Sequence, residues 1–326
     1  MNLPLNCWYL AAWEKELPRG EHLARTIAEQ PLLLMCDEEG NMAALLDRCP
    51  YRFALLSKGR FSECNKEVAC GYHGLKFNSK GECLENPHGP ITEKMCLKTF
   101  PVCHRYRGVW VWLGDPSKAD PSLISDDLGD VEKYPETAQA SGVLEVKANF
   151  QLLSDNILDL SHGDYLHPET VGGGSATRAK QSLEQDEKEI RVSWFCEKEK
   201  PLPLLASAFE ENQLVDFNIN VRWTPPSTMW LNFKNYPTGN PEGKGQDNLA
   251  FHIMTPVDSK TSLYFYWIGR GQDQDNKELN EIYHQTGIQV CSGLMAPDTL
   301  IRDNTSQRLR CHHEAKTHVQ TVPQRV

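Results

Sequence analysis

The sequence predicts an α+β protein with two domains. At 326 residues the chain is long enough for about two domains of roughly 150 residues each. The first third consists of short apolar runs separated by turn residues, which is typical of an all-β domain. A segment with helical spacing at 155–167 is followed by long β runs, which favour an antiparallel sheet combined with helix in the second domain.

Composition places the chain among ordinary globular proteins. Hydrophobic residues make up 40% of it, and the formal net charge is −10, from 34 Lys and Arg against 44 Asp and Glu. The apolar content is sufficient for a sizeable core, which excludes a disordered chain, and no apolar run approaches the ~18–20 residues of a membrane span. An acidic chain without a basic stripe argues against nucleic acid as a partner.

Two further features predict a cytoplasmic protein. The N-terminal stretch has no basic region, and Trp13, Glu14 and Lys15 interrupt its apolar residues, so we expect no signal peptide. Eleven cysteines without such a signal indicate a reducing compartment, with metal-binding or structural thiols in place of a disulfide framework.

The elements of the first domain are defined by their turns. Apolar runs on either side of 37–40 predict a hairpin, and a second hairpin is predicted around 79–81. Residues 107–113 are predicted to form a buried strand. The polar, Pro-bearing segment 117–139 has no period and is predicted to connect the domains, which we place at 1–118 and 119–326.

The second domain is predicted to contain two long hairpins. One pairs 213–223 with 227–236, and the other covers 248–271 and turns at 256–259. The stretch 277–309 has a mostly helical pattern. The remaining polar residues have no period and are predicted to form a loose tail.

Two short motifs in the first domain place a cysteine beside a turn. They are Cys49-Pro50-Tyr51-Arg52 and Cys70-Gly71-Tyr72-His73-Gly74. Two close pairs of ligands on neighbouring loops can hold one metal centre from two sides. Cys-x-His with Cys-x2-His is the ligand set of a Rieske [2Fe–2S] cluster, in which two thiolates hold one iron and two imidazoles hold the other.

A second constellation lies in the helical segment. Asn156, Asp159 and His162 are spaced i, i+3 and i+6, so they are predicted to share one helical face. His162 and His167 are five apart and do not align on an uninterrupted helix. The glycine after His162 and the proline after His167 predict that the helix loosens or ends there, which lets His167 turn back. Two imidazoles and one carboxylate form the facial triad of non-heme Fe(II) oxygenases, with positions left for O2 and water.

These motifs, with CWYLAAWEKEL at the N-terminus, NPHG at 86–89 and GVWVWLGDP at 108–116, resemble the Rieske non-heme iron oxygenases. Within that family the sequence is similar to the vanillate and dicamba O-demethylase branch. The resemblance covers residues 3 to about 309. It implies an N-terminal all-β Rieske domain and a C-terminal helix-grip domain, in which an antiparallel sheet wraps around a long helix.

The resemblance also implies cofactors, partners and a reaction. The cofactors are a [2Fe–2S] cluster and Fe(II), and electrons come from NAD(P)H through a separate reductase or ferredoxin. The implied reaction uses O2 to hydroxylate an aromatic substrate or a methyl group, and a hydroxylated O-methyl group is lost as formaldehyde. The third iron ligand lies in a late helix of the family, and Asp298 matches that position, although Pro297 stands where the family usually has an acidic residue.

Tyr51 departs from the family pattern, because it stands where the family has the first cluster histidine. A tyrosine oxygen lies much farther from Cα than the near ring nitrogen of histidine, and it would bind as an anionic phenolate that lowers the cluster potential. Three outcomes remain open: the cluster is absent, it assembles weakly with water or another group, or Tyr51 ligates with altered geometry. The other implied cluster ligands are Cys49, Cys70 and His73.

The resemblance assigns roles to two further residues of the helical segment. Asp159 matches an aspartate that links a cluster histidine of one subunit to an iron histidine of the next, here His73 and His162, and carries the electron between them. Such a contact implies a head-to-tail ring, which for this family means a homotrimer. Asn156 is expected near the iron without being a firm ligand.

The similarity to dicamba-type enzymes places Asn232 and His252 at positions that face the substrate, in MWLNF and AFHIM. An amide and an imidazole in an apolar pocket can bind a carboxylate or a phenol. Two alternatives to a working oxygenase remain. One is a cluster-deficient homologue that binds iron or ligand but is not turned over by a reductase, and the other is a non-catalytic subunit on the same fold.

Overall fold

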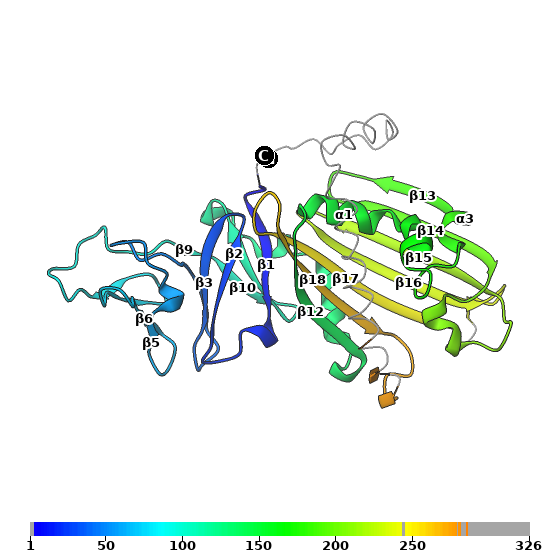
Figure 1. The fold of residues 1–326 in the computed structure, drawn as a ribbon, viewed down its shortest axis with the longest axis horizontal. Helices are drawn as coiled ribbons and strands as arrows, with labels where there is room; N and C mark the ends of the chain where they lie inside the picture. The colour runs from blue at the N-terminus through cyan, green and yellow to red at the C-terminus, as the bar shows by residue number, and fades with distance from the viewer. Residues whose placement is uncertain (1–2, 243–244, 279, 282–284, 286–326) are drawn as a thin grey trace. The chain divides into compact units, whose positions relative to one another are not determined.

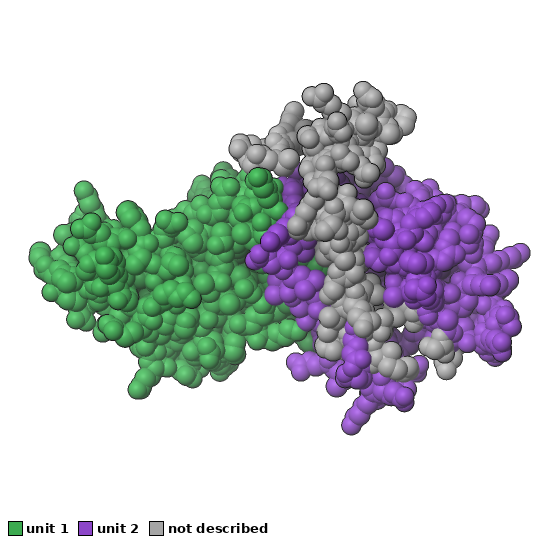
Figure 2. Space-filling model, viewed as in Figure 1, with its two compact units in different colours: residues 1–133, 255–265 green, residues 134–254, 266–326 purple. Residues whose placement is uncertain are grey.

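The computed structural model describes residues 3–242, 245–278, 280–281 and 285, and these fall into two compact units (Figure 2). Unit 1 comprises 1–133 and 255–265, and unit 2 comprises 134–254 and 266–326. Most of the predicted C-terminal helix and the whole tail lie outside the described residues, as does Asp298. No described helix is long and apolar enough to cross a membrane.

The units divide fifteen residues later than the boundary at 118/119 that the sequence suggested. The connecting segment is a series of 3-10 turns, one of which spans Asp126–Lys133 and buries Leu128 and Val131. Arg105 and the Tyr106 hydroxyl donate hydrogen bonds to the Asp126 carboxylate, at 2.7 and 2.8 Å, and so hold this turn on unit 1. Apolar burial and these bonds explain why the segment packs with the first unit.

Unit 1 is built from three small antiparallel sheets (Figure 1). In the order of their pairing, the strands of the first sheet are β1 (Cys7–Trp13), β11 (Gly108–Leu113) and β10 (Val102–Arg105). The second sheet consists of β2 (His22–Ile27), β3 (Gln30–Cys36), β4 (Met42–Leu46) and β9 (Thr99–Phe100). The third sheet consists of β5 (Arg60–Phe61), β6 (Glu67–Ala69), β7 (Lys76–Asn78) and β8 (Cys83–Glu85).

The structure contains the predicted elements of unit 1. β3 and β4 pair on either side of 37–40, and β7 pairs with β8 across 79–81. All six residues of β11 are buried, as expected of a strand rich in valine and tryptophan. A separate apolar cluster around Leu33, Val68 and Phe77 also contains Cys49 and Cys70, so the cysteine loops pack in a core between strands of the second and third sheets.

Unit 2 is built on one seven-stranded antiparallel sheet (Figure 1). Its strands, in spatial order, are β12 (Gln139–Val146), β18 (Ser262–Arg270), β17 (Gln246–Pro256), β16 (Thr228–Pro237), β15 (Val215–Thr224), β14 (Ile190–Glu199) and β13 (Lys180–Gln185). The predicted hairpins β15–β16 and β17–β18 are present. The tip of the second hairpin, 255–265, belongs to unit 1, where the backbone N–H groups of Ala28 and Glu29 donate to its carbonyls.

Helices pack on one face of this sheet. α1 (Phe150–Leu158) begins at Asn149, whose side chain accepts a hydrogen bond from the Gln151 N–H. The short helices α2 (Gly163–Leu166) and α3 (Ser175–Arg178) follow it, and α1 and α3 lie over β14 and β15 in Figure 1. The chain therefore has the predicted α+β architecture, an all-β first part and an antiparallel sheet with few helices. The longest described α-helix has nine residues.

Candidate metal centres and substrate face

The two cysteine loops of unit 1 share one hydrogen-bonding pattern. The Cys49 N–H donates to the Ala54 carbonyl at 2.8 Å, and the Phe53 N–H donates to the Cys49 carbonyl at 2.9 Å. The Cys70 loop repeats both bonds at the same sequence spacing, with distances of 2.8 and 3.0 Å. Two matched, closed turns therefore present the two cysteines, as the spacing of the motifs predicted.

The two thiols are buried beside one another. Cys49 and Cys70 are each 1% exposed. Burial raises the pKa of Cys49, the N–H groups of Tyr51 and Arg52 partly offset that rise, and the adjacent Cys70 thiol adds to it. Backbone N–H groups directed at sulfur are a feature that tunes iron–sulfur clusters. The pair can hold one iron from the protein side.

The imidazole side of this site contains four aromatic rings. The Tyr51 and His73 ring centroids are 4.9 Å apart and nearly perpendicular, at 84°. His88, which the sequence analysis noted only as part of NPHG, lies 5.6 Å from His73 at 83°, and Tyr72 lies 4.0 Å from His73. The signal that would have found His88 is its place on a glycine- and proline-bearing turn after the second cysteine loop.

The residues present therefore fit a two-iron cluster in part. Two buried thiols and His73 stand where the family motif places them, while Tyr51 provides an exposed ring in place of an imidazole. Within the described parts of the chain, no three His, Cys, Asp or Glu side chains lie close enough to share a single ion. The candidate side chains are arranged in pairs, and a Rieske cluster takes two protein ligands at each iron.

The histidine segment of unit 2 is broken differently from the prediction. α1 ends at Leu158, Asp159 leaves the helical region with φ −111° and ψ 84°, and a 3-10 turn at Leu160–His162 leads into α2. The break at Asp159 was not predicted and Gly163 is helical, but α2 ends at Leu166, directly before His167 and the proline, as the sequence predicted. Asn156, Asp159 and His162 therefore do not lie on one continuous helix. The physical reason is that the Asp159 carboxylate accepts hydrogen bonds from the N–H and the hydroxyl of Ser161 and so caps the following turn.

The imidazole rings of His162 and His167 lie close together, and in the described residues the Nε2 atom of each ring has no hydrogen-bond partner. Their ring centroids are 5.7 Å apart at 80°. The Nδ1–H of His162 donates to the Asp159 carbonyl, which leaves Nε2 as the atom with a lone pair. Within the described residues, the Nε2 atoms of both histidines are buried and have no hydrogen-bond partner. Burial, and next the neighbouring His162, lower the pKa of His167. Two imidazoles that each direct a buried nitrogen, unpartnered among the described residues, are ligands that suit a divalent iron.

Asn156 adds a third buried polar atom to this segment. Its Oδ1 is buried without a partner in the described part of the chain, on α1 directly before the histidines. The arrangement is consistent with the expected place of Asn156 near the iron. The expected carboxylate ligand Asp298 lies outside the described residues.

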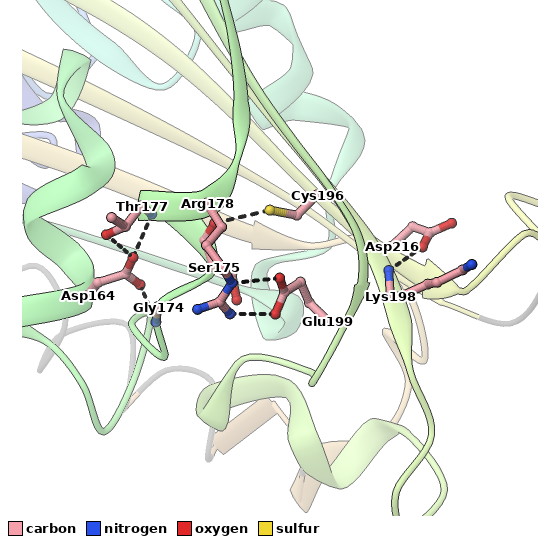
Figure 3. A network of polar contacts seen from close by, with 9 residues as sticks. All are labelled: Asp164, Gly174, Ser175, Thr177, Arg178, Cys196, Lys198, Glu199 and Asp216. Carbon is pink, nitrogen blue, oxygen red and sulfur yellow. Dashed lines mark hydrogen bonds and ion pairs between the residues drawn. The ribbon is translucent and has the colours of Figure 1, made fainter.

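A network of polar contacts, here called the α2–α3 network, holds the histidine segment in place (Figure 3). Asp164, between the two histidines, accepts hydrogen bonds from the Gly174 N–H at 2.7 Å and from the Thr177 N–H and hydroxyl at 2.6 and 2.7 Å. Arg178, at the end of α3, donates through two nitrogens to Glu199 of β14 at 3.0 and 2.6 Å. A fork of two charge-assisted bonds fixes orientation as well as position.

The α2–α3 network also identifies the face of the sheet that is covered by helices. The Cys196 thiol of β14 contacts the Ser175 carbonyl of α3 at 3.0 Å, so Cys196 points toward the helices. Side chains alternate between faces along each strand, and directly paired residues share a face. Cys196 pairs with Phe217, Phe217 with Asn235, and Asn235 with Gln246. These residues define the helix-covered face.

Replacing Asp164 with alanine is expected to weaken iron binding about 10- to 100-fold, because loss of supporting contacts misorients the histidines. Iron affinity is measured by titrating the metal-free chain with Fe(II) under anaerobic conditions. Asp186→Ala is the matched control, since Asp186 caps the β13–β14 turn by accepting from the N–H groups of Lys188 and Glu189. Equal iron affinity in Asp164→Ala and Asp186→Ala would show that the α2–α3 network does not position the histidines.

The two predicted substrate residues lie on opposite faces of the sheet. His252 pairs with Met229 and shares the helix-covered face with Asn235, whereas Asn232 pairs with Leu249 and points the other way. Asn232 donates to Asp247 at 2.7 Å on that opposite face. The prediction that both residues face one substrate is therefore wrong for the pair, because the pairing register separates them. His252 keeps the position that faces the helices.

Two asparagines that sequence analysis missed lie on the helix-covered face. Asn235 is 1% exposed and Asn248 is 7% exposed. Within the described residues, both side-chain polar atoms of Asn235, Nδ2 and Oδ1, have no hydrogen-bond partner. The Oδ1 atom of Asn248 also has none. Asn248 pairs with Phe233, so the two amides are diagonal neighbours. A buried amide without partners costs free energy of folding, which indicates a ligand-binding role. The available signal was their place in strands among apolar residues.

His252 makes the stability of the protein depend on pH. Burial lowers its pKa from 6.5 to about 4. The unfolded chain then binds a proton that the folded chain does not, so the stabilisation is complete above pH 6.5 and is lost as the pH falls toward 4. We expect a loss of about 2 kcal/mol between pH 7 and pH 5 that His252→Gln lacks. Urea unfolding at both pH values measures it, and equal pH dependence in the two proteins would contradict it.

Comparison with known proteins connects both sites to one class of enzyme. Residues 7–101 match the Rieske [2Fe-2S] domain, and residues 146–291 match the vanillate O-demethylase oxygenase C-terminal domain. The chain is 36% identical to the iron–sulfur subunit of a toluene-4-sulfonate monooxygenase system from Comamonas testosteroni, over 86% of this chain and 82% of the relative.

Two comparisons extend over nearly the whole chain. The dicamba O-demethylase oxygenase component of Stenotrophomonas maltophilia is 35% identical, over 97% of this chain and 91% of the relative. The crystal structure of dicamba monooxygenase bound to 3,6-dichlorosalicylic acid superposes with a TM-score of 0.82 and 31% identity, covering 95% of this chain and 90% of the other. The fold is thus shared over nearly the whole of both chains.

Proposed function

Because the chain belongs to the Rieske-type oxygenases, as the oxygenase component, we propose that it hydroxylates or O-demethylates an aromatic substrate. Enzymes of this class use a [2Fe–2S] cluster and Fe(II), and the cluster receives electrons from a separate reductase or ferredoxin. The electrons are expected to come from NAD(P)H. For an O-methyl substrate the overall reaction is R–O–CH3 + O2 + 2e⁻ + 2H⁺ → R–OH + HCHO + H2O.

The observation that carries this proposal is the pair of buried, unpartnered Nε2 atoms of His162 and His167. A buried nitrogen lone pair without a donor is costly unless a metal ion takes it. When bound, iron at these nitrogens supplies the activation of O2. The chain itself supplies two oriented imidazoles, with Asp164 and the Asp159 carbonyl fixing their segment and tautomer.

The helix-covered sheet face supports a substrate with an acidic group. Both amide atoms of Asn235 and the Oδ1 acceptor of Asn248 are without partners in the described residues, and His252 lies on the same face. Amides and imidazoles donate hydrogen bonds to carboxylate or sulfonate oxygens. Relatives are named for toluene-4-sulfonate and for dicamba, and the matching crystal structure holds an aromatic acid. We assign this face to binding of the acidic head of an aromatic substrate.

Replacing Asn235 with leucine is expected to raise KM about tenfold while raising the free energy of unfolding by about 1–3 kcal/mol. Both effects have one cause, because leucine removes a buried amide that only the substrate satisfies. Steady-state kinetics and urea unfolding measure them. Asn232→Leu is the matched control: it removes a bond to Asp247 on the opposite face, so it lowers stability and leaves KM unchanged. An unchanged KM in Asn235→Leu would contradict the assignment.

Asp159 is proposed to carry electrons between neighbouring chains of a homotrimer. Its carboxylate is exposed, it accepts from the Ser161 hydroxyl at 2.6 Å, and its own carbonyl accepts from His162. The residue therefore combines a solvent-facing acceptor with a direct contact to a proposed iron ligand. Such an acceptor can bind an imidazole N–H of a second copy. Light scattering of the purified protein tests the trimer.

Tyr51 favours a second candidate function, a homologue that binds iron but receives no electrons from a reductase. Both candidates hold the catalytic iron and bind the substrate. They differ in acid-labile sulfide and in reductase-coupled turnover. A non-catalytic subunit would show neither turnover nor substrate-dependent consumption of O2.

The proposal is tested by supplying the purified oxygenase with NADH, a dicamba-type reductase and ferredoxin, and a panel of methoxylated and sulfonated aromatic acids. Formaldehyde release coupled to substrate-dependent O2 consumption is the expected result. Absence of turnover across the panel, by a chain that holds both metal centres and binds the acids, would overturn the assignment of O-demethylation or hydroxylation of such acids.

A further inference from the structure

The imidazole side of the cluster site lacks one histidine of the expected motif but contains another from a third loop. We infer that His88 and His73 together hold the second iron of the cluster, and that Tyr51 is not a ligand. The inference rests on the proposed function, since it concerns the cluster through which the oxygenase receives electrons. It explains how a chain with tyrosine at position 51 can keep a two-thiolate, two-imidazole cluster.

The ring geometry is that of a pair that can share a metal ion. The His73 and His88 centroids are 5.6 Å apart at 83°. The proposed catalytic pair His162 and His167 shows nearly the same relation, 5.7 Å at 80°. Two imidazoles bound to one ion through metal–nitrogen bonds of about 2.1 Å keep their centroids within about 6.5 Å of each other. The separation therefore requires no large movement of either loop.

The tautomer of His88 also suits ligation. Its Nε2 lies 2.9 Å from the His73 carbonyl oxygen, and a carbonyl only accepts, so Nε2 carries the proton. In a neutral ring the lone pair is then on Nδ1. Metal-binding histidines usually donate their second ring N–H to a carbonyl or carboxylate, which fixes the ring orientation. Here that carbonyl belongs to the partner ligand itself.

The loop that carries His88 is built and placed by specific contacts. The Asn86 side chain accepts from the His88 N–H at 3.1 Å and donates to the Pro90 carbonyl at 3.1 Å, which closes the turn. Gly74, at φ +76°, follows His73 in the neighbouring loop, and a Cβ there would lie 3.4 Å from Pro87. The two loops therefore meet at Gly74 and Pro87 as well as at the two imidazoles.

Tyr51 is placed as a neighbouring ring. Its ring is nearly parallel to that of His88, at 13° and 6.3 Å, and the Arg52 guanidinium lies 5.5 Å from its centroid. Ligation through the phenol would place an anionic oxygen at the far end of the side chain, whereas His88 supplies the neutral nitrogen that a Rieske iron takes. The charge and size of the two side chains both favour His88.

The test uses the full chain, purified anaerobically with ¹⁵N-labelled histidine and reduced with dithionite. Electron–nuclear double resonance should show two histidine nitrogen couplings in the unchanged protein and in Tyr51→Phe. His88→Ala should lose one coupling and lower acid-labile sulfide about tenfold or more. The control His104→Ala, which removes a histidine paired with Glu14 elsewhere in unit 1, should keep both couplings.

A second variant separates ligation from folding. Tyr51→His combined with His88→Ala restores the family motif, so it should regain sulfide and two couplings. The inference is overturned if His88→Ala keeps both couplings, if Tyr51→Phe loses one, or if the unchanged chain contains no acid-labile sulfide. Formaldehyde release, measured on the same samples, reports separately on the proposed function: two couplings without turnover would overturn the function and leave the ligation intact.

Discussion

Replacing His162 with alanine is expected to remove the catalytic iron and lower formaldehyde release by more than about 100-fold, since even changes outside the ligand set cost 10- to 100-fold. The physical reason is that the Nε2 atoms of His162 and His167 are buried and, in the described residues, without a partner, so iron loses one of two oriented nitrogens. Iron should fall from about three to about two per chain while sulfide stays at about two.

The cluster serves as the internal control in that experiment. Its ligands lie in unit 1 and the substitution is in unit 2, so visible absorption should be unchanged. His104→Ala, outside both centres, should keep full iron and activity. A His162→Ala protein that retains three irons and normal turnover would show that the histidine pair does not hold the catalytic iron.

Replacing Asp159 with asparagine should slow electron transfer from cluster to iron site about 100-fold and leave both metal centres filled. Asparagine preserves shape and the backbone carbonyl that orients His162, but it removes the anionic acceptor that the proposal assigns to the neighbouring chain. Stopped-flow measurement of cluster reoxidation, in the presence of O2 and substrate, gives the rate directly.

Ser161→Ala is the matched variant for this test. It removes the hydroxyl that donates to the Asp159 carboxylate at 2.6 Å and keeps the charge. Reoxidation should therefore stay within a few-fold of the unchanged protein. Equal rates in Asp159→Asn and the unchanged protein would contradict the proposed electron route and remove the main argument for a head-to-tail ring.

Local signals in the sequence predicted the hairpins of both units. Turn residues at 37–40 and 79–81, and the long runs that became β15 to β18, identify strands because the apolar pattern and the turn chemistry agree. The strands β12, β13 and β14 were missed. Every residue of β13 is exposed and all but Leu183 are polar, so neither alternation nor an apolar run marks it, and only pairing with β14 makes it a strand.

The candidate sites show where sequence reasoning stops. The motifs predicted that Cys49 lies beside Cys70 and His162 beside His167, and the structure brings each pair together. The positions of the substrate-face residues depend on the pairing register of the strands, because a shift of one residue moves a side chain to the other face of the sheet. The local sequence therefore does not predict that His252 and Asn232 lie on opposite faces. The sequence likewise does not reveal that the helix breaks at Asp159.

His88 illustrates a contact between loops that are separate in sequence. It reaches His73 across fifteen residues, through the closed turn built by Asn86. Asn235 and Asn248 were missed for a similar reason, since their missing partners become visible only once the sheet is assembled. Buried polar atoms without partners were the most informative structural signal at the proposed iron site and on the substrate face.

The central claim is that one chain holds a two-iron cluster and a separate catalytic iron. Its most direct test is the iron and acid-labile sulfide content of anaerobically purified protein, together with the visible spectrum. The account predicts about three irons and two sulfides per chain and the red-brown absorption of a Rieske cluster. One iron or fewer, with no sulfide and a nearly colourless protein, would contradict it and leave at most a non-heme iron site without an entry point for electrons.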